Sequence, residues 1–196
     1  MRRVRVVKLG GSLLTLPSLR EKFLRWCYDH PHPLSLIVVG GGTVVDAVRA
    51  IDQANPIEDE FAHWLCIDLM RHTARLAHQI LGNVLLCETE DAVQRLMAES
   101  ENDPSARALA IVQVACFLGK DCNLMNIPTS WDVTSDSLAA AFCQLQAAEE
   151  LVVMKSTDVR EDFGNLVSLA EKGIVDRHFP EMAKALRVRF VNLKSY

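Results

Sequence analysis

Two glycine turns, each directly after a run of apolar residues, are the first candidates for chemistry in this sequence. The first turn comprises Lys8, Leu9, Gly10, Gly11 and Ser12, and the second comprises Gly40, Gly41, Gly42 and Thr43. Glycines let the backbone approach a phosphate closely and direct amide N–H groups at its oxygens, while Lys8 would add a positive charge. Neither turn has the spacing of a P-loop, and both could be purely structural.

A third segment gathers hydroxyl and carboxyl groups in front of an alanine-rich helical pattern. It runs Ser130, Trp131, Asp132, Val133, Thr134, Ser135, Asp136 and Ser137. One N-cap needs only one such side chain, and Thr134 or Ser135 would be sufficient. The surplus suggests a second role, in which Asp136 holds Lys8 and the hydroxyls meet a transferred phosphate.

A fourth segment places polar side chains at the end of the apolar run Leu151–Met154. Lys155, Ser156, Thr157 and Asp158 follow that run directly. In an open α/β sheet the carboxyl ends of the strands face the ligand crevice, so Lys155 and Asp158 are candidate nucleotide contacts. An ordinary solvent-exposed strand end is the alternative.

Short apolar runs alternate with longer helical patterns along the chain, which predicts an α/β fold. We expect a three-layer αβα sandwich with a mostly parallel central sheet, formed as one domain by residues 1–196. The expected strands are Val4–Leu9, Leu36–Val39, Val84–Cys87, Leu109–Val114, Leu151–Met154 and Arg187–Leu193. The expected helices are Leu19–Tyr28, Thr43–Gln53, Glu58–Leu81, Asp91–Glu99, Ser135–Ala148, Asn165–Glu171 and Phe179–Leu186.

The longest expected helix, Glu58–Leu81, carries apolar residues beyond those that one core-facing stripe needs. Its regular stripe comprises Phe61, Leu65, Leu69, His72, Leu76 and Ile80. Spacings of three and four place these residues on one face, which predicts that this face packs against the rest of the protein. Trp64 and Met70 lie off that stripe and suit either a subunit interface, as in a homodimer, or a second core face.

Composition excludes several function classes. The net charge is -4, hydrophobic residues make up 49% of the chain and charged residues 23%, as in ordinary globular proteins. The negative charge argues against a nucleic-acid partner, and no apolar stretch is long enough for a signal peptide or a membrane span. We therefore expect a cytoplasmic protein without nucleic-acid or membrane partners.

Cysteine and histidine spacing gives no sign of a metal site. The six cysteines, with no CxxC pair among them, are expected to be buried and reduced; they are Cys27, Cys66, Cys87, Cys116, Cys122 and Cys143. The six histidines show no HExxH spacing. His63, on the longest expected helix, is either a substrate contact or a packed side chain.

Taken together and in this order, the four segments resemble the amino-acid kinase family, which includes acetylglutamate kinase, uridylate kinase and aspartokinase. The resemblance spans the chain from Lys8 to about Pro180. The short chain, the triplet Ala62-His63-Trp64, the run 130–137 and the stretch Gly173-Ile174-Val175-Asp176 are similar to one small branch, the aminomethylfuran phosphate kinase of methanofuran biosynthesis.

The resemblance implies an ATP-dependent phosphotransferase that converts a small phosphomonoester to a diphosphate and releases ADP. It implies that Lys8, Gly10, Gly11 and Ser12 meet the ATP phosphates, and that Gly40, Gly41, Gly42 and His63 face the acceptor. Asp136 would organise the catalytic lysine, with the nucleotide near Thr134, Ser135, Lys155, Thr157 and Asp158. Mg²⁺ would be carried by ATP rather than by a protein site.

One departure from the family pattern leaves the reaction open. Many members have a second catalytic lysine late in the chain, where this sequence reads Gly-Ile-Val-Asp-Arg-His-Phe-Pro over residues 173–180. Lys155 or Arg177 could replace it. A non-catalytic protein that binds a nucleotide or an anion is the main alternative, and a kinase for a nucleoside monophosphate or a carboxylate is another.

Overall fold

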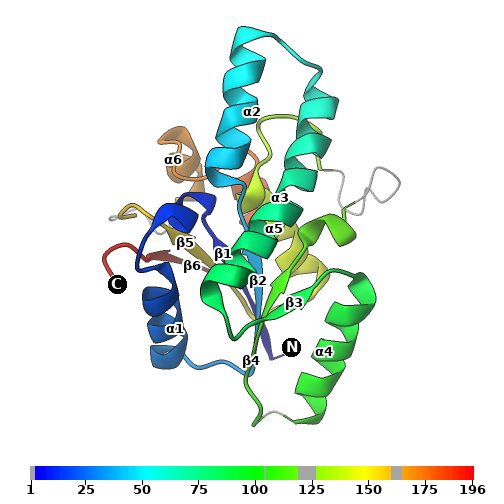
Figure 1. Ribbon diagram of the computed structural model, residues 1–196, viewed down its shortest axis with the longest axis vertical. Helices are drawn as coiled ribbons and strands as arrows, with labels where there is room; N and C mark the ends of the chain where they lie inside the picture. Colours follow the sequence, from blue (N-terminus) through cyan, green and yellow to red (C-terminus); the bar gives the residue numbers. More distant parts are fainter. Residues whose placement is uncertain (1–2, 104, 119–126, 160–164) are drawn as a thin grey trace.

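A sheet of six parallel strands forms the centre of the protein in the computed structural model (Figure 1), which describes residues 3–103, 105–118, 127–159 and 165–196. The strands are β1 (Val4–Leu9), β2 (Leu34–Val39), β3 (Leu85–Cys87), β4 (Ala108–Val112), β5 (Glu150–Lys155) and β6 (Val188–Asn192). Their order is β3-β4-β2-β1-β5-β6, and every pairing is parallel. Parallel pairing brings all the carboxyl ends to one edge of the sheet.

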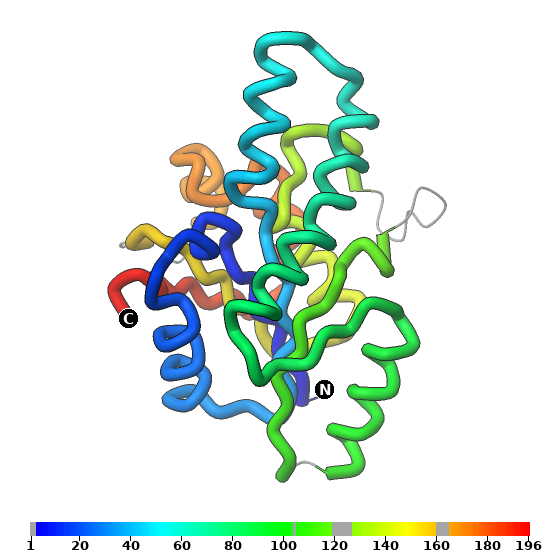
Figure 2. The backbone as a smooth tube through the Cα atoms, viewed as in Figure 1, coloured from blue at the N-terminus to red at the C-terminus, as the bar shows by residue number. Residues whose placement is uncertain are grey.

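Helices connect the strands. They are α1 (Leu19–Asp29), α2 (Gly42–Ala54), α3 (Asp59–Leu81), α4 (Glu90–Asn102), α5 (Ser135–Leu145), α6 (Leu166–Glu171) and α7 (Phe179–Ala183). Short 3-10 turns follow β1 at Gly11–Thr15 and β4 at Val114–Cys116. Figure 2 shows the chain returning repeatedly to the central sheet, and Figure 1 shows α2 and the start of α3 as a hairpin beyond the sheet edge.

The two faces of the sheet pack into two separate apolar clusters. Both β1 and β2 are buried along their full length, as strands covered on both faces must be. Side chains that alternate along β1 divide accordingly, so that Val7 and Leu9 pack with α1 and the later part of α3. Val4 and Val6 point to the other face, where α4, α5 and α7 cover the sheet. The three-layer αβα architecture is therefore confirmed.

Several element boundaries differ from those expected. The fourth strand ends at Val112 rather than Val114, because the chain turns there into the 3-10 turn. Helix α5 ends at Leu145 rather than Ala148, and Ala147 adopts a φ of 50°, a left-handed conformation that cannot continue a helix. Helix α7 stops at Ala183 rather than Leu186, whereas α4 continues past Glu99 to Asn102.

The prediction for the packed face of the longest helix is wrong. Phe61 and Leu76 are 57% and 52% exposed, and His72 and Ile80 are also exposed. The core instead receives the opposite face of α3, which includes Ile67, Met70, Ala74, Ala77 and Leu81. Small residues on that face let the helix lie close to the sheet, whereas the larger apolar side chains remain outside.

Two further expectations concern cysteines and membranes. Cys87 and Cys143 are buried free thiols, whereas Cys27, Cys66 and Cys116 are free but only partly buried; Cys122 lies outside the described residues. None of the helices within the described ranges is both long and apolar enough to cross a membrane.

Candidate active site

Strand alternation places two lysines on the same face of the sheet at its carboxyl edge. Lys8 follows Val4 and Val6 on the α5 side of β1, and Lys155 follows Leu151 and Val153 on that side of β5. The strands are neighbours, and their register pairs Lys8 with Val153. Lys155 therefore stands two residues further along the adjacent strand, on the same side as Lys8.

Asp136, the second residue of α5, lies between the two lysines. Its Oδ1 is 2.7 Å from the Lys8 Nζ, and its Oδ2 accepts a hydrogen bond of 2.7 Å from the Lys155 Nζ. The Lys8 and Asp136 side chains are each 5% exposed, and the Lys155 side chain is 15% exposed. One carboxylate thus orients two nearly buried ammonium groups.

Burial and charge act in opposite directions on these groups. Burial by itself would raise the pKa of Asp136, but Lys8 and Lys155 outweigh it and hold that pKa below its ordinary value. Burial and the positive charge of Lys8 lower the pKa of Lys155 to about 8, although Asp136 and Asp176 oppose the shift. The site therefore holds a net positive charge whose size changes in the mildly alkaline range.

The two glycine turns touch each other at the same edge of the sheet. A Cβ added to Gly11 would lie 2.1 Å from the Gly42 backbone N, and one added to Gly42 would lie 2.4 Å from the Gly11 backbone O. Gly42 also has a φ of 54°, which side chains disfavour. Only glycine fits this contact, and the turns bring the start of α2 beside the end of β1.

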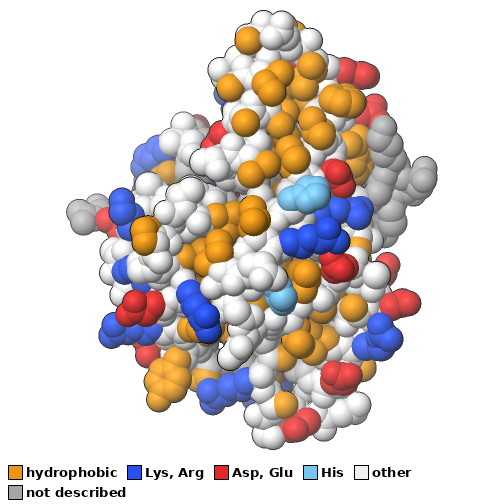
Figure 3. All heavy atoms as spheres, viewed as in Figure 1, with side chains coloured by type: hydrophobic (Ala, Val, Ile, Leu, Met, Phe, Trp, Pro, Cys, Tyr) orange, Lys and Arg blue, Asp and Glu red, His pale blue; other side chains and the backbone are white. Residues whose placement is uncertain are grey.

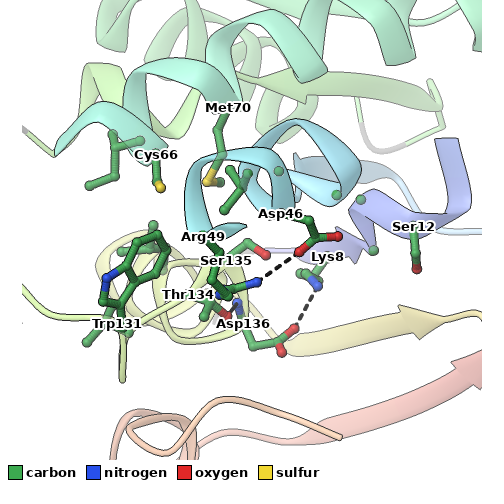
Figure 4. Close-up of a pocket in the computed structure, with 18 of the residues that line it drawn as sticks. Lys8, Ser12, Asp46, Arg49, Cys66, Met70, Trp131, Thr134, Ser135 and Asp136 are labelled. Atoms are coloured by element: carbon green, nitrogen blue, oxygen red, sulfur yellow. Dashed lines mark hydrogen bonds and ion pairs between the residues drawn. The ribbon is translucent and has the colours of Figure 1, made fainter. Parts of the chain in front are cut away.

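A pocket of about 250 Å³ lies over these residues. Lys8, Lys155 and Asp136 form part of it, together with Gly10, Gly11, Ser12, Gly41 and Gly42 from the two turns and Thr134 and Ser135 from the start of α5. Figure 4 shows Lys8 directed at Asp136, with Thr134 and Ser135 beside them. Ammonium groups, a helix N-terminus and glycine turns around one cavity are suited to binding phosphates.

Helices α2 and α3 close the other side of the pocket. Val45, Ile67 and Met70 supply apolar surface, and the Arg49 guanidinium lies 5.0 Å from the centre of the Trp131 ring. Arg49 also donates a 2.8 Å hydrogen bond to Asp46, as Figure 4 shows. This side of the pocket can accept a flat apolar ring that bears a charged substituent.

The family assignment follows from the sequence of the same region. Residues 3–173 match the amino acid kinase family. The chain belongs to that family. It is therefore a kinase of a small substrate, and the pocket over Asp136 lies within the matched region.

One curated relative covers most of this kinase. It is the [5-(aminomethyl)furan-3-yl]methyl phosphate kinase of Methanocaldococcus jannaschii, which is 26% identical in a match 192 residues long; the match covers 93% of this chain and 84% of the relative. The small-branch resemblance expected from the sequence agrees with this match.

Solved structures confirm the fold of the kinase. Uridylate kinase from Archaeoglobus fulgidus superposes with a TM-score of 0.62 at 14% identity over 95% of this chain and 89% of its own. UMP kinase from Bacillus anthracis superposes with a TM-score of 0.63 at 14% identity, over 97% of this chain and 87% of its own. Aspartate kinase from Synechocystis has a TM-score of 0.55 at 16% identity, and the match covers 95% of this chain but only 38% of the aspartate kinase chain.

Some expected site residues of the kinase do not line the pocket. Gly40 is not among the lining residues, and its backbone N donates a 2.9 Å hydrogen bond to the Leu9 O. Thr157 and Asp158 lie beyond the end of β5, and Asp158 accepts a 2.7 Å hydrogen bond from Asn192. Ser12 does line the pocket, with its hydroxyl 3.2 Å from that of Ser156. The crevice contact predicted for Asp158 is thus not found in this pocket.

His63 is a buried pocket residue of α3. Burial lowers the pKa of its imidazole, against the opposing effect of a hydrogen bond with the Ser130 backbone. A neutral ring can donate or accept a hydrogen bond without adding charge to the cavity. Its edge-on contact with Trp64, with ring centres 5.4 Å apart, makes it a packed side chain as well as a lining residue, and its contact with substrate stays a prediction.

Arg177, one of the two candidates to replace the second lysine, does not line the pocket over Asp136. Its side chain is 82% exposed and pairs with Asp132 at 3.5 Å, outside the pocket over Asp136. Of the two candidates considered for that position, Lys155 is the one that contacts Asp136.

Sequence reasoning missed Asp46, Arg49 and Asp176. Asp46 and Arg49 lie near the start of α2, the helix that directly follows the second glycine turn. Their closeness to that turn in the sequence was a signal that could have identified them. Asp176 accepts hydrogen bonds from residues about forty positions earlier, which no local pattern reveals.

Membership of the kinase family implies a nucleotide substrate and usually Mg²⁺. Within the described ranges, no group of three His, Cys, Asp or Glu side chains could hold a metal ion. The cationic cavity supplies lysine and backbone donors for phosphate oxygens instead. Mg²⁺ commonly binds to proteins through few ligands and substrate phosphates.

Proposed function

We propose that the protein transfers the γ-phosphoryl group of ATP–Mg²⁺ to the phosphate of a small phosphomonoester, giving a diphosphate and ADP. The observation that carries the proposal is the bridging of Lys8 and Lys155 by buried Asp136, with the two glycine turns beside it. A protein that merely bound an anion would not need two lysines aligned by one carboxylate. The non-catalytic alternative is therefore the weaker one.

The residues of the pocket would act mainly by positioning and by neutralising charge. ATP supplies the phosphoryl group, and an oxygen of the acceptor phosphate forms the new bond to phosphorus as the bond to the ADP oxygen breaks. Lys8 and Lys155 would stabilise the negative charge of the moving phosphoryl group, and the backbone amides of the glycine turns would orient the phosphates next to it. No residue need become covalently phosphorylated.

Charge and shape on the α2–α3 side of the pocket support a cyclic acceptor, such as aminomethylfuran-methyl phosphate. Trp131, Met70 and Ile67 offer a surface for a flat ring, and the Asp46 carboxylate could receive an ammonium group. The relative from Methanocaldococcus jannaschii is named for a substrate that combines a furan ring, an aminomethyl group and a phosphate. All three features match groups present here.

We also propose that the protein is a homodimer through the exposed face of α3. Phe61, Leu76 and Ile80 on that helix and Ile51 on α2 are exposed large apolar side chains. Figure 3 shows hydrophobic side chains gathered over the α2–α3 hairpin. A two-fold axis would bury the same face of both subunits, which is the commonest symmetry of soluble oligomers.

The deciding experiment measures ADP formation from ATP–Mg²⁺ with aminomethylfuran-methyl phosphate, UMP, aspartate or no acceptor. We expect turnover that depends on the furan phosphate, detected together with the diphosphate product by mass spectrometry. Lys8→Ala should reduce that turnover by about a hundredfold or more, the loss expected for one transition-state charge contact. ATP binding without acceptor-dependent turnover would support the non-catalytic alternative instead, and faster turnover with UMP or aspartate would reassign the acceptor.

A further inference from the structure

Asp176, in the segment between α6 and α7, accepts an unusual number of hydrogen bonds for one carboxylate. Oδ2 accepts from the Thr134 N at 2.9 Å, the Thr134 Oγ1 at 2.8 Å and the Ser137 N at 3.0 Å. Oδ1 accepts from the Ser137 Oγ at 2.5 Å, the His178 N at 3.1 Å and the Phe179 N at 2.9 Å. Each oxygen thus serves three donors.

These bonds join the first turn of α5 to the first turn of α7. At the start of α5 the Thr134 Oγ1 accepts from the Asp136 N at 3.5 Å, and Asp176 accepts from the next amide, the Ser137 N, so both side chains hold this turn. The backbone turn that Asp176 fixes runs from Thr134 to Ser137 and has Asp136 within it. Any movement of that turn would displace the carboxylate that bridges Lys8 and Lys155.

We infer that Asp176 is a positioning residue for the lysine pair, locking the first turn of α5 to the start of α7 so that Asp136 stays between Lys8 and Lys155. The inference rests on the proposed phosphoryl transfer, because it assigns a role to Asp176 in that reaction. Asp176 itself need not touch a substrate.

Electrostatics supports the same assignment. The charged groups that act on Lys155 are Lys8 from β1, Asp136 from α5 and Asp176 from the segment before α7. Burial and Lys8 lower the pKa of Lys155, whereas Asp136 and Asp176 raise it. Asp176 thus lies close enough to Lys155 for its carboxylate to raise the pKa of that ammonium group.

The first test needs no kinase activity. Lysines labelled with ¹³C at Cε are titrated by NMR in the parent protein, and the Lys155 signal is assigned with Lys155→Arg. In Asp176→Asn we expect Lys155 to lose its proton at a lower pH than in the parent. Asp132→Asn is the matched control, because Asp132 is a nearby exposed carboxylate that pairs with Arg177, and it should leave that titration unchanged. An unchanged Lys155 titration in folded Asp176→Asn would overturn the inference.

The second test measures turnover per folded molecule. Asp176→Asn should lower kcat by about tenfold to a hundredfold with little change in KM, as expected when a reacting geometry is misaligned. A variant with a reduced melting temperature but parental kcat would show that Asp176 is only structural. If the parent protein itself shows no turnover, the proposed reaction fails, and the NMR titration still reports on Asp176.

If Asp176→Asn does not fold, Ser137→Ala tests whether Asp176 positions the lysine pair. This change removes one hydroxyl donor to Asp176 but keeps the carboxylate charge, and Ser137 does not line the pocket. We expect kcat to fall several-fold while the Lys155 titration stays parental. A parental kcat in Ser137→Ala would contradict the positioning role.

Discussion

We expect Lys155 to make the reaction sensitive to pH, because burial and the charge of Lys8 lower its pKa to about 8. The protonated form provides the charge, so kcat should fall as the pH rises through about 8. Lys155→Arg gives the matched comparison, since a guanidinium stays charged far above that pH. This variant should be slower at neutral pH because its planar group fits Asp136 differently, yet its kcat–pH profile should lose the fall near pH 8. A parent profile that stays level to pH 9.5 would contradict the assignment of Lys155.

Asp136 should matter to both stability and rate. It does not cap α5, since Thr134 does so, and Asp136 instead neutralises two nearly buried ammonium groups. Asp136→Asn would leave these charges uncompensated, which destabilises buried sites. We expect a lower melting temperature and a kcat reduced by about a hundredfold or more per folded molecule.

Asp136→Asn should be measured by thermal and kinetic assays, with Asp46→Asn as the control for the thermal assay. Asp46 has a 64% exposed side chain, so its loss should leave the melting temperature near that of the parent. Parental kcat in folded Asp136→Asn would exclude the bridged lysine pair as the catalytic centre.

The start of α2 depends on the contact between the two glycine turns. In Gly42→Ala the new methyl group would meet the Gly11 backbone in addition to the cost of a φ of 54°. Gly173→Ala is a matched control, because its φ is 68° but nothing lies within 4 Å of an added Cβ. The control should lose about 1–2 kcal/mol of unfolding free energy from backbone strain alone.

Gly42→Ala should lose about 1–3 kcal/mol more than that control, the usual cost of forcing extra atoms into a packed contact. It should also weaken ATP binding, because separated turns no longer present their amides together. Urea denaturation and calorimetry measure the two effects. Equal losses of stability in Gly42→Ala and Gly173→Ala would mean that the turns tolerate separation.

The proposed dimer predicts a particle of twice the 21.9 kDa chain mass in light scattering at micromolar concentration. Leu76→Asp, on the exposed face of α3, should give a monomer because a charge would be buried in the interface. Tyr28→Asp is the control, as Tyr28 is a large exposed side chain on a different helix, α1. A parent mass of one chain would exclude the dimer, and dissociation by Tyr28→Asp as well would remove α3 as its location.

Local pattern was sufficient for much of the fold. Strand β1 has its predicted bounds, Val4–Leu9, and Thr134 caps α5 as one of the two residues expected there. Such features depend on neighbours within a few positions, where periodicity and capping chemistry act. The glycine turns and the lysine at a strand end are local features as well, and from them the sequence predicts a phosphate site.

The face that α3 buries could not be read from the same kind of pattern. Large apolar residues such as Phe61 and Leu76 formed the regular stripe, yet small residues such as Ala74 and Ala77 face the sheet. Close approach between a helix and a sheet favours small side chains, and hydrophobic periodicity alone does not record that distance.

The sequence by itself determined the strands, the glycine turns, the capped start of α5 and the presence of Lys8, Asp136 and Lys155. Only the tertiary structure decided that one carboxylate meets both lysines, that Arg177 points away and that Asp176 fixes the turn around Asp136. Strand register and helix docking bring together β1, α5, β5 and the segment before α7. Side-chain contacts among them depend on distances of a few ångströms between residues far apart in the chain, which no local preference specifies.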